Sequence, residues 1–371
     1  MKKSLLALAV LGAFAGVASA QSSVTLFGTI DLNARYVDNS GAGTRYSMGQ
    51  DGINSSQLGF RGVEDLGGGL KASFVLLAGV NADTGTTNAK FFNRKATIGL
   101  SGGFGEVRLG RDYTPTFWNY TIFDAFGTNG VGSSVNMIPA VVAQSTFVRA
   151  DNSIGYFLPA GIGGLYGQFM AAAGEGGNGV AANGTQRGST GNVGSCAVRP
   201  TTVGATCATS VNANSGQYLG GRLGWAAGPF DIAGSYAQAG VDSLNDDAKS
   251  WSVGGSWNFG IAKLMGYYGE TKLQTAKASV YSISTVVPLG AGEIHAGYSS
   301  GELSTANSTS NQIAVGYVYN LSKRTALYTT ASFLDNDSGR NASVAGGSSV
   351  TGAPSLGGRS TGFEFGVRHF F

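Results

Sequence analysis

The sequence is poor in proline, in charge and in long apolar runs. Only 7 of its 371 residues are Pro, 12% are charged, and it has 2 Cys and 2 His. Soluble domains carry about 25% charged residues. Disorder is excluded, because it requires low hydrophobicity and high net charge, whereas this chain is 42% hydrophobic with a net charge of +3. A helical membrane bundle is excluded because no run after residue 20 approaches the roughly 18 apolar residues that a spanning helix needs.

Glycine, in contrast, is abundant, with 61 residues. The glycines keep no period of three, which excludes a collagen-like chain. The length favours two or three domains, unless the chain forms one large β barrel.

The N-terminus predicts export from the cytoplasm. Lys2 and Lys3 precede the apolar run 5–17, and Ala18-Ser19-Ala20 follows it. This order is that of a signal peptide covering residues 1–20 with cleavage near Ala20. An anchoring helix is the alternative, but the run is short and no charged stop follows. Without the two lysines, 22 Lys and Arg face 21 Asp and Glu, so no basic field is available to hold nucleic acid.

The two cysteines, Cys196 and Cys207, lie in sequence rich in Gly, Ser, Thr and Asn. In an exported protein such a close pair predicts one loop disulfide. A metal site is the alternative, but no His or carboxylate cluster accompanies the pair. The sequence predicts no metal and no cofactor.

Alternation with a period of two runs through the remaining chain. In residues 24–36, Val24, Leu26 and Ile30 share one face of a strand, whereas Asp31 and Arg35 share the other. Thirteen alternating residues suit a tilted membrane strand of about 9–11 residues better than an ordinary strand of about 5–6. The same alternation closes the chain in residues 361–371.

The spacers between these segments are alternately short and long, as in membrane barrels with short periplasmic turns and long outer loops. We therefore predict an all-β fold, a transmembrane 16-stranded antiparallel β-barrel formed by residues 21–371. A soluble secreted sandwich or solenoid is the alternative, but it needs more surface charge. The predicted strands are 24–36, 55–63, 70–77, 92–100, 105–111, 149–158, 164–173, 217–226, 230–238, 250–259, 262–270, 278–287, 293–300, 312–320, 325–333 and 361–371.

Several motifs, specific only in combination, resemble the general porins of Gram-negative bacteria, especially their β-proteobacterial branch. They are the start at residues 21–28, the turn at 59–67 with Lys71, Asn93-Arg94, residues 102–111, residues 149–154 and the closing residues 367–371. The resemblance implies a homotrimer of sixteen-stranded barrels, surrounded by outer-membrane lipid and lipopolysaccharide, with the third long loop folded into each lumen. It also implies that the outer-membrane assembly machinery reads the last strand, which ends at Phe371.

The third long connection, about 112–148, is rich in aromatic residues. A sixteen-stranded barrel encloses an aqueous channel, which must be narrowed before it can sieve solutes, and the resemblance implies that this connection narrows it. By the same resemblance Asp112 and Asp124 face the pore. A surface loop that docks on a partner subunit is the alternative. The basic residues expected opposite the loop are Arg61, Lys71, Lys95, Arg108 and Arg149, with Arg94 close by.

The excess of basic over acidic groups predicts a mild preference for anions. Each of these groups has an alternative role as a merely solvated or paired wall residue. In the predicted strand 92–100, Arg94 shares the face of the apolar Ile98 and Leu100, which is the lipid face. Its place in the lumen therefore requires a bulge or rests on the resemblance. Many relatives have Arg where this chain has Gln57, which weakens the expected basic cluster.

Enzymatic function is not predicted. Residues 99–103 and 297–301 both fit G-x-S-x-G, but neither is followed by the helical pattern of a nucleophile elbow. The sequence instead predicts a passive diffusion channel for ions and small hydrophilic solutes. The alternatives are a solute-selective channel for organic anions and a structural or adhesive barrel.

Overall fold

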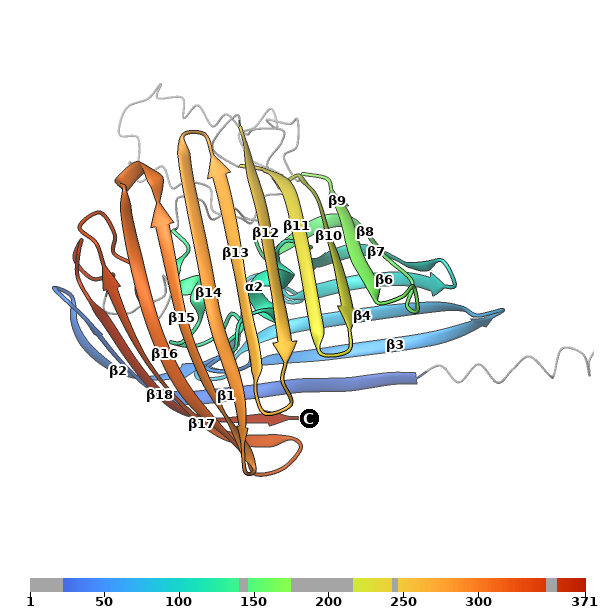
Figure 1. Ribbon diagram of the computed structural model, residues 1–371. Helices are drawn as coiled ribbons and strands as arrows, with labels where there is room; N and C mark the ends of the chain where they lie inside the picture. Colours follow the sequence, from blue (N-terminus) through green and yellow to red (C-terminus); the bar gives the residue numbers. More distant parts are fainter. Residues whose placement is uncertain (1–22, 140–145, 175–215, 242–245, 345–351) are drawn as a thin grey trace, which may run out of the picture.

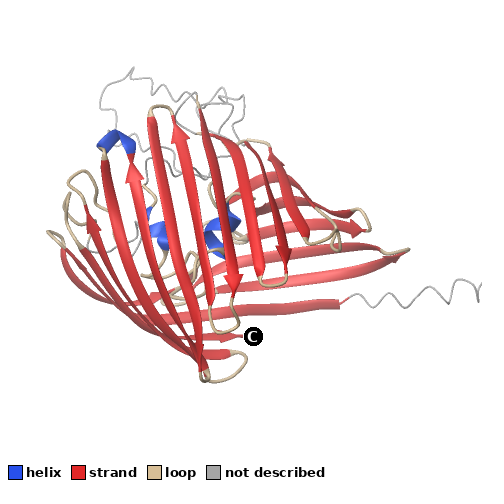
Figure 2. Cartoon of the chain, in the orientation of Figure 1, coloured by secondary structure: helices blue, strands red, loops and turns tan. Residues whose placement is uncertain are grey.

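The computed structural model describes residues 23–139, 146–174, 216–241, 246–344 and 352–371. Strands form nearly all of it, and three short helical segments lie between them (Figure 2). Among the described residues no helix is long and apolar enough to cross a membrane. The strands are β1 (Ser23–Asn39), β2 (Gly43–Gln50), β3 (Gln57–Gly67), β4 (Leu70–Asn81), β5 (Thr86–Thr87), β6 (Lys95–Gly102), β7 (Gly105–Tyr113), β8 (Arg149–Phe157), β9 (Leu165–Ala172), β10 (Tyr218–Ala227), β11 (Phe230–Gly240), β12 (Asp247–Asn258), β13 (Lys263–Leu273), β14 (Ala276–Leu289), β15 (Gly292–Leu303), β16 (Ser308–Asn320), β17 (Thr325–Asn336) and β18 (Ser360–Phe370); the helical segments are α2 (Phe117–Ile122), η1 (Ser134–Met137) and η3 (Ser304–Ala306).

The sheet closes on itself through its first strand. One edge of β1 pairs with β18 over Thr29–Asn39, and its other edge pairs with β3 over Ser23–Thr29. β2 is not a separate wall strand, because it folds back on the rest of β1 over Leu32–Asn39. The two-residue β5 pairs only with the end of β4. Sixteen antiparallel strands therefore form the closed wall (Figure 1), and the predicted 16-stranded barrel is confirmed.

The connections differ in part from the prediction. The longer ones gather at the upper end of the barrel in Figure 1, and short turns join the strands at the lower end. β13 and β14, however, are joined at the upper end by Gln274 and Thr275 alone, with Gln274 in the left-handed conformation (φ 53°). Both strands extend beyond their predicted limits, so the expected strict alternation of short and long connections is wrong here.

The two faces of the wall are inverted relative to a soluble protein. Ile313 on β16 is 62% exposed on the outer face, whereas its neighbour Gln312 is 1% exposed on the inner face. Glu364 on β18 is fully buried between the exposed Phe363 and Phe365. Polar side chains therefore fill the interior and apolar ones cover the outside, as in a barrel embedded in lipid.

One irregularity shapes the wall near the third long connection. The register of β7 and β8 shifts between Gly110 and Asp112, and β8 contributes the extra residue there. Asn152 takes the left-handed conformation (φ 50°) within it. Gly110 itself has φ +118°, and a Cβ on it would lie 2.1 Å from the carbonyl oxygen of Ala96.

We expect Gly110→Ala to lower the free energy of unfolding by about 2–3 kcal/mol, because an L side chain is strained at this φ and meets backbone. The urea midpoint of the folded protein in detergent micelles measures this. Gly103→Ala is the matched control, because a Cβ there meets nothing within 4 Å. Equal midpoints for the two variants would contradict the assigned bulge geometry.

Candidate functional site

The third long connection lies in the interior and is fixed mainly to one side of the wall. Its helix α2 lies within the ring of strands (Figure 1). Asn119 on α2 donates to Ser252 Oγ at 3.0 Å and accepts from Arg222 Nε at 2.6 Å. Further along, the Ala125 amide donates to Ser284 Oγ at 2.9 Å. These partners are inward-facing side chains of β10, β12 and β14, so the connection is attached at several strands in succession.

The second half of the connection is attached in the same way. Gln312 Nε2 donates to the carbonyl oxygen of Gly132 at 2.9 Å, and the Val131 amide donates to Glu364 Oε1 at 3.4 Å. Arg340 Nη2 donates to the carbonyl oxygen of Met137 at 2.6 Å. The apolar side chains between these bonds, Phe123, Val131 and Met137, are fully buried. The wall from β10 to β18 is thus covered by a packed layer.

Asp124 lies inside this layer and holds it together. Its carboxylate accepts hydrogen bonds from the Oγ and the amide of Ser134 and, at 2.9 Å, from the amide of Phe126. The side chain is 6% exposed. Burial raises the pKa of Asp124 to about 6, against the bonds from Ser134 and Phe126, which lower it. The structure therefore places Asp124 under the loop, away from the lining of the open lumen.

An open cavity of about 1210 Å³ remains between this layer and the opposite wall. Strands of the first half of the chain form one side, and Phe117, Trp118, Asn129 and Asn136 form the other. Four arginines and two aspartates contribute to the lining, which gives it an excess of positive charge. They are Arg35, Arg45, Arg94, Arg149, Asp51 and Asp83.

Two of these arginines share one tyrosine. Arg94 Nη2 and Arg149 Nη2 donate to the hydroxyl of Tyr113 at 3.1 and 2.9 Å. The guanidinium of Arg149 also lies 4.4 Å from the centre of the Tyr113 ring. Within the described part of the chain neither arginine has a carboxylate partner, and the buried Nε of each has no hydrogen-bond partner. Neither guanidinium forms an ion pair with a described residue, although Asp51 lies within electrostatic range of Arg94 and offsets part of its charge.

Arg94 lies at the lumen without the bulge that alternation of faces along the predicted strand 92–100 required. The residue precedes β6, which begins at Lys95, and its amide donates to the carbonyl oxygen of Leu77. Strand alternation does not apply before the strand begins. The parity argument thus failed because the predicted strand, 92–100, began too early.

The other predicted lumen residues form separate groups. Asp112 binds Lys95 Nζ at 2.9 Å and Arg108 Nη1 at 2.6 Å, and Arg108 also binds Glu106 at 2.8 Å. Two basic and two acidic groups therefore neutralise one another in this cluster. Arg61 and Lys71 lie apart from it, both exposed near the short-turn end; Arg61 stands 5.2 Å from the Phe27 ring, and Lys71 faces Asp65 in register.

Some residues of the site were not in the sequence-derived set. Trp118 and Arg45 line the cavity, and Glu364 binds both the loop and Arg35, at 3.1 Å. The sequence could have indicated Glu364, because it is the one carboxylate in the alternating segment 361–371. Arg45 had no such signal, because β2 lies in a segment predicted as loop.

The remaining predicted positions are less informative. The amide and carbonyl of Phe371 pair with those of Gly28 at 3.1 and 3.0 Å, and its role as an assembly signal stays a prediction. Cys196, Cys207 and the signal peptide lie outside the described residues. Within the described ranges no group of His, Cys, Asp and Glu side chains is arranged to hold a metal ion.

Comparison with known proteins decides the family. A family model described as Gram-negative porin matches residues 7–339. The chain belongs to the Gram-negative porins. It is 38% identical to outer membrane porin protein 32 of Delftia acidovorans, over the full length of both chains, and 29% identical to an outer membrane porin protein of Bordetella pertussis, over 91% of this chain and 95% of that one.

Solved structures agree with this assignment. An anion-selective porin from Comamonas acidovorans superposes with a TM-score of 0.78 at 34% identity, covering 95% of this chain and all of that one. A trimeric form of OmpT from Vibrio cholerae, at 13% identity and a TM-score of 0.64, shares the fold. The porin is thus a β-barrel of the Gram-negative outer membrane, of the β-proteobacterial type, and a channel protein rather than an enzyme.

The buried carboxyl of Asp124 predicts a pH dependence with a definite sign. Because its pKa in the folded porin, about 6, exceeds the ordinary value of 3.8, the folded state binds the proton more tightly than the unfolded state. The stabilisation is complete at low pH and is lost as the pH rises from about 4 through about 6.

We expect the difference in unfolding free energy between the wild type and Asp124→Asn to change by about 2 kcal/mol between pH 4 and pH 7, because only the wild type titrates. Urea unfolding in micelles at the two pH values measures it. A difference that stays constant over this range would show that Asp124 is not buried as described.

Proposed function

We propose that the porin is a passive diffusion channel with a mild preference for anions, in which the third long connection narrows the lumen. The observation that carries this proposal is the lining of the 1210 Å³ cavity, where arginines outnumber aspartates and two arginines lack a carboxylate partner. Fixed positive charge along a pore raises the local concentration of anions and lowers that of cations.

The position of the connection supports its role as the constriction. Most of its hydrogen bonds to the wall run to β9–β18, and Asn129 also accepts one from Ser55, between β2 and β3, at 2.9 Å. The connection therefore lies mainly against one side of the lumen and leaves the arginine-lined cavity open. Small hydrophilic ions cross such a passage down their gradient, without chemistry or energy coupling. The solved relative described as anion-selective has the same fold at 34% identity, which favours the same selectivity here.

We further propose that the porin assembles as a homotrimer, as the family resemblance implies. A second function, selective passage of organic anions, is favoured by the pairing of Arg94 and Arg149 around Tyr113. Two cationic groups that are held by one tyrosine and line the cavity offer a fixed place for a carboxylate. Saturable inhibition of chloride current by a dicarboxylate separates this function from general diffusion.

Selectivity is tested by the reversal potential of the porin in a planar bilayer with a KCl gradient. The wild type is expected to prefer chloride. In Arg94→Gln/Arg149→Gln the ratio of chloride to potassium permeability should fall. The Coulomb energy of a unit charge at ~6 Å in water changes the local concentration of each ion by about threefold, in opposite directions for chloride and potassium, so the ratio falls by up to about tenfold per charge.

Arg324→Gln is the control, because this exposed residue lies in the short turn between β16 and β17. It removes one positive charge outside the lumen and should leave the ratio unchanged. Conductance steps that occur in threes support the trimer. The proposed role of the two arginines is refuted if the wild type prefers potassium or if the double variant behaves like the control. The channel itself is refuted if pure, folded protein gives no conducting steps.

A further inference from the structure

The open cavity in the lumen has two chemically different sides. The facing wall lines it with four arginines and two aspartates. Between Arg111 and Arg149 the sequence contains no Lys, Arg or His, so the third long connection places no cationic group in the lumen. Its described residues instead line the cavity with neutral side chains, several of them apolar, which are Phe117, Trp118, Val135, Ile138 and Phe147. A solute that contacts both sides at once therefore needs an anionic end and an apolar body.

Trp118 on α2 has a fixed orientation. Its Nε1 donates to Gln168 Oε1 of β9 at 3.0 Å, and Gln168 Nε2 donates in turn to the carbonyl oxygen of Tyr113 at 3.1 Å. The indole also lies against the ring of Tyr113, with the ring centres 5.3 Å apart. The side chain is half-buried and lines the cavity. A flat aromatic surface is thus held in place, and part of it stays open to a solute.

The arginines of the wall reach the same tyrosine. The guanidinium of Arg149 lies 4.4 Å from the centre of the Tyr113 ring, and Arg94 and Arg149 both donate to its hydroxyl. Tyr113 therefore brings the cationic groups and the indole together. A guanidinium has five N–H donors, so those that Tyr113 does not use remain for a carboxylate, which it binds in its own plane. Aromatic rings associate in offset-stacked or edge-to-face arrangements, so the ring of an aromatic acid bound there can pack on Trp118.

We propose that this part of the lumen is a subsite for aromatic monocarboxylates, anions of the benzoate type. The carboxylate binds Arg94 and Arg149, and the ring packs on Trp118. One carboxylate is favoured over two, because a second would point toward the neutral side of the cavity, where the connection offers it no cation. The inference rests on the proposed function and names the class of organic anion that the channel selects.

The experiment measures how sodium benzoate blocks the chloride current of the folded porin in planar bilayers. Cyclohexanecarboxylate is the comparison solute, because it carries the same charge on a six-membered ring that is not flat. Benzoate should block the wild type saturably, with a half-blocking concentration about two- to tenfold lower than that of cyclohexanecarboxylate, which is the contribution of one aromatic contact. Benzyl alcohol, which has the ring without the charge, should not block.

Two substitutions of Trp118 separate the aromatic ring from its structural role. Trp118→Leu and Trp118→Phe both lose the hydrogen bond to Gln168, but only Trp118→Phe keeps an aromatic ring. Each blocked current is divided by the unblocked current of the same variant. Trp118→Leu should raise the half-blocking concentration of benzoate to that of cyclohexanecarboxylate, whereas Trp118→Phe should retain most of the difference between the two solutes.

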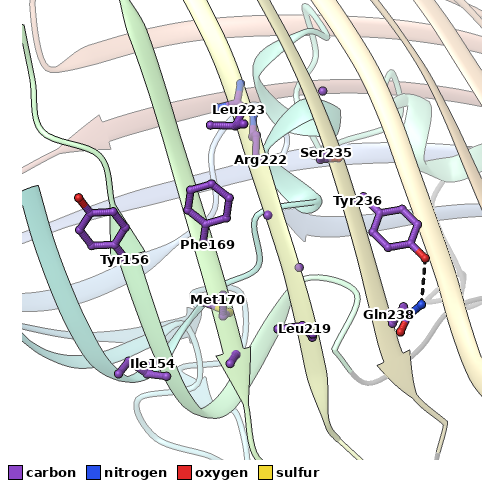
Figure 3. Close-up of a pocket in the computed structure, with 14 residues that line it drawn as sticks. Ile154, Tyr156, Phe169, Met170, Leu219, Arg222, Leu223, Ser235, Tyr236 and Gln238 are labelled. Atoms are coloured by element: carbon purple, nitrogen blue, oxygen red, sulfur yellow. Dashed lines mark hydrogen bonds between the residues drawn. The ribbon is translucent and has the colours of Figure 1, made fainter. Parts of the chain in front are cut away.

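Phe169→Leu is the matched control, because it removes an aromatic ring from the strand that holds Trp118. Phe169 follows Gln168 on β9 but points the other way, since it is exposed on the outer face whereas Gln168 is buried. Figure 3 shows Phe169 at an apolar groove that also contains Leu219, Leu223 and Tyr236, which are exposed on the same face. Benzoate should block this variant as it blocks the wild type.

Three results would overturn the inference. The first is equal block of the wild type by benzoate and cyclohexanecarboxylate. The second is equal block of Trp118→Leu and Trp118→Phe by benzoate. The third is a loss of block in Phe169→Leu as large as that in Trp118→Leu.

Arg94→Gln/Arg149→Gln keeps this inference apart from the proposed function. This double variant should lose the block by both carboxylates, and a block that persists would show that the arginines do not hold the carboxylate. If the double variant loses the block but Trp118→Leu does not, the arginines act as proposed and the aromatic subsite is wrong. A wild type that prefers potassium refutes the proposed function itself.

Discussion

The closing ladder between β1 and β18 is the constraint on which the rest of the porin depends. Backbone amides and carbonyls in a hydrocarbon layer have no water to bind, so a sheet in a membrane must leave no free edge. Eleven residues of β1 pair with β18, from Thr29 to Asn39, while the other edge of β1 is shared by β2 and β3. Closure also separates two solvents, lipid outside and water within. The inverted burial of Ile313 and Gln312 follows directly from that separation.

Closure creates an interior that is wider than its own side chains fill, and the third long connection packs into part of it. This connection is held by polar groups that a soluble core would exclude, including Asn119, Asp124 and Glu364. Because those bonds lie on the side of β10–β18, the opposite wall stays open. The charges on the open wall then decide what it attracts. Lys95, Arg108, Glu106 and Asp112 neutralise one another, whereas Arg94 and Arg149 form no ion pair within the described chain and share the hydroxyl of Tyr113. On the proposed function, the selectivity of this weakly charged chain depends on these few unpaired groups.

Alternation along single strands was enough to predict the barrel, its sixteen strands and the inward face of Arg35, because period and face are local properties of a strand. It failed where structure departs from regular strands. Arg94 precedes β6, Arg45 lies in a strand predicted as loop, and β13 and β14 join through a turn that the spacing did not reveal. Sequence also did not reveal that Asp124 turns under the loop. Its partners, Ser134 and Phe126, are close in the chain, but the direction of the carboxylate depends on packing against Tyr267 and the wall.

The account rests most directly on the position of the third connection against the wall. A Cβ on Gly301 of β15 would lie 2.7 Å from the carbonyl oxygen of Met137 in η1 and 2.8 Å from its Cβ. A disulfide needs a Cβ separation of about 3.5–4.5 Å, so the backbone of η1 must move by about 1 Å to admit it. The decisive measurement is cross-linking of Met137→Cys/Gly301→Cys in outer membranes, with Cys196 and Cys207 replaced by Ser, followed by conductance of the oxidised porin. The account predicts ready oxidation and unchanged conductance. Thiols that stay reduced in folded porin, or a channel whose conductance changes once the connection is tethered, would contradict it.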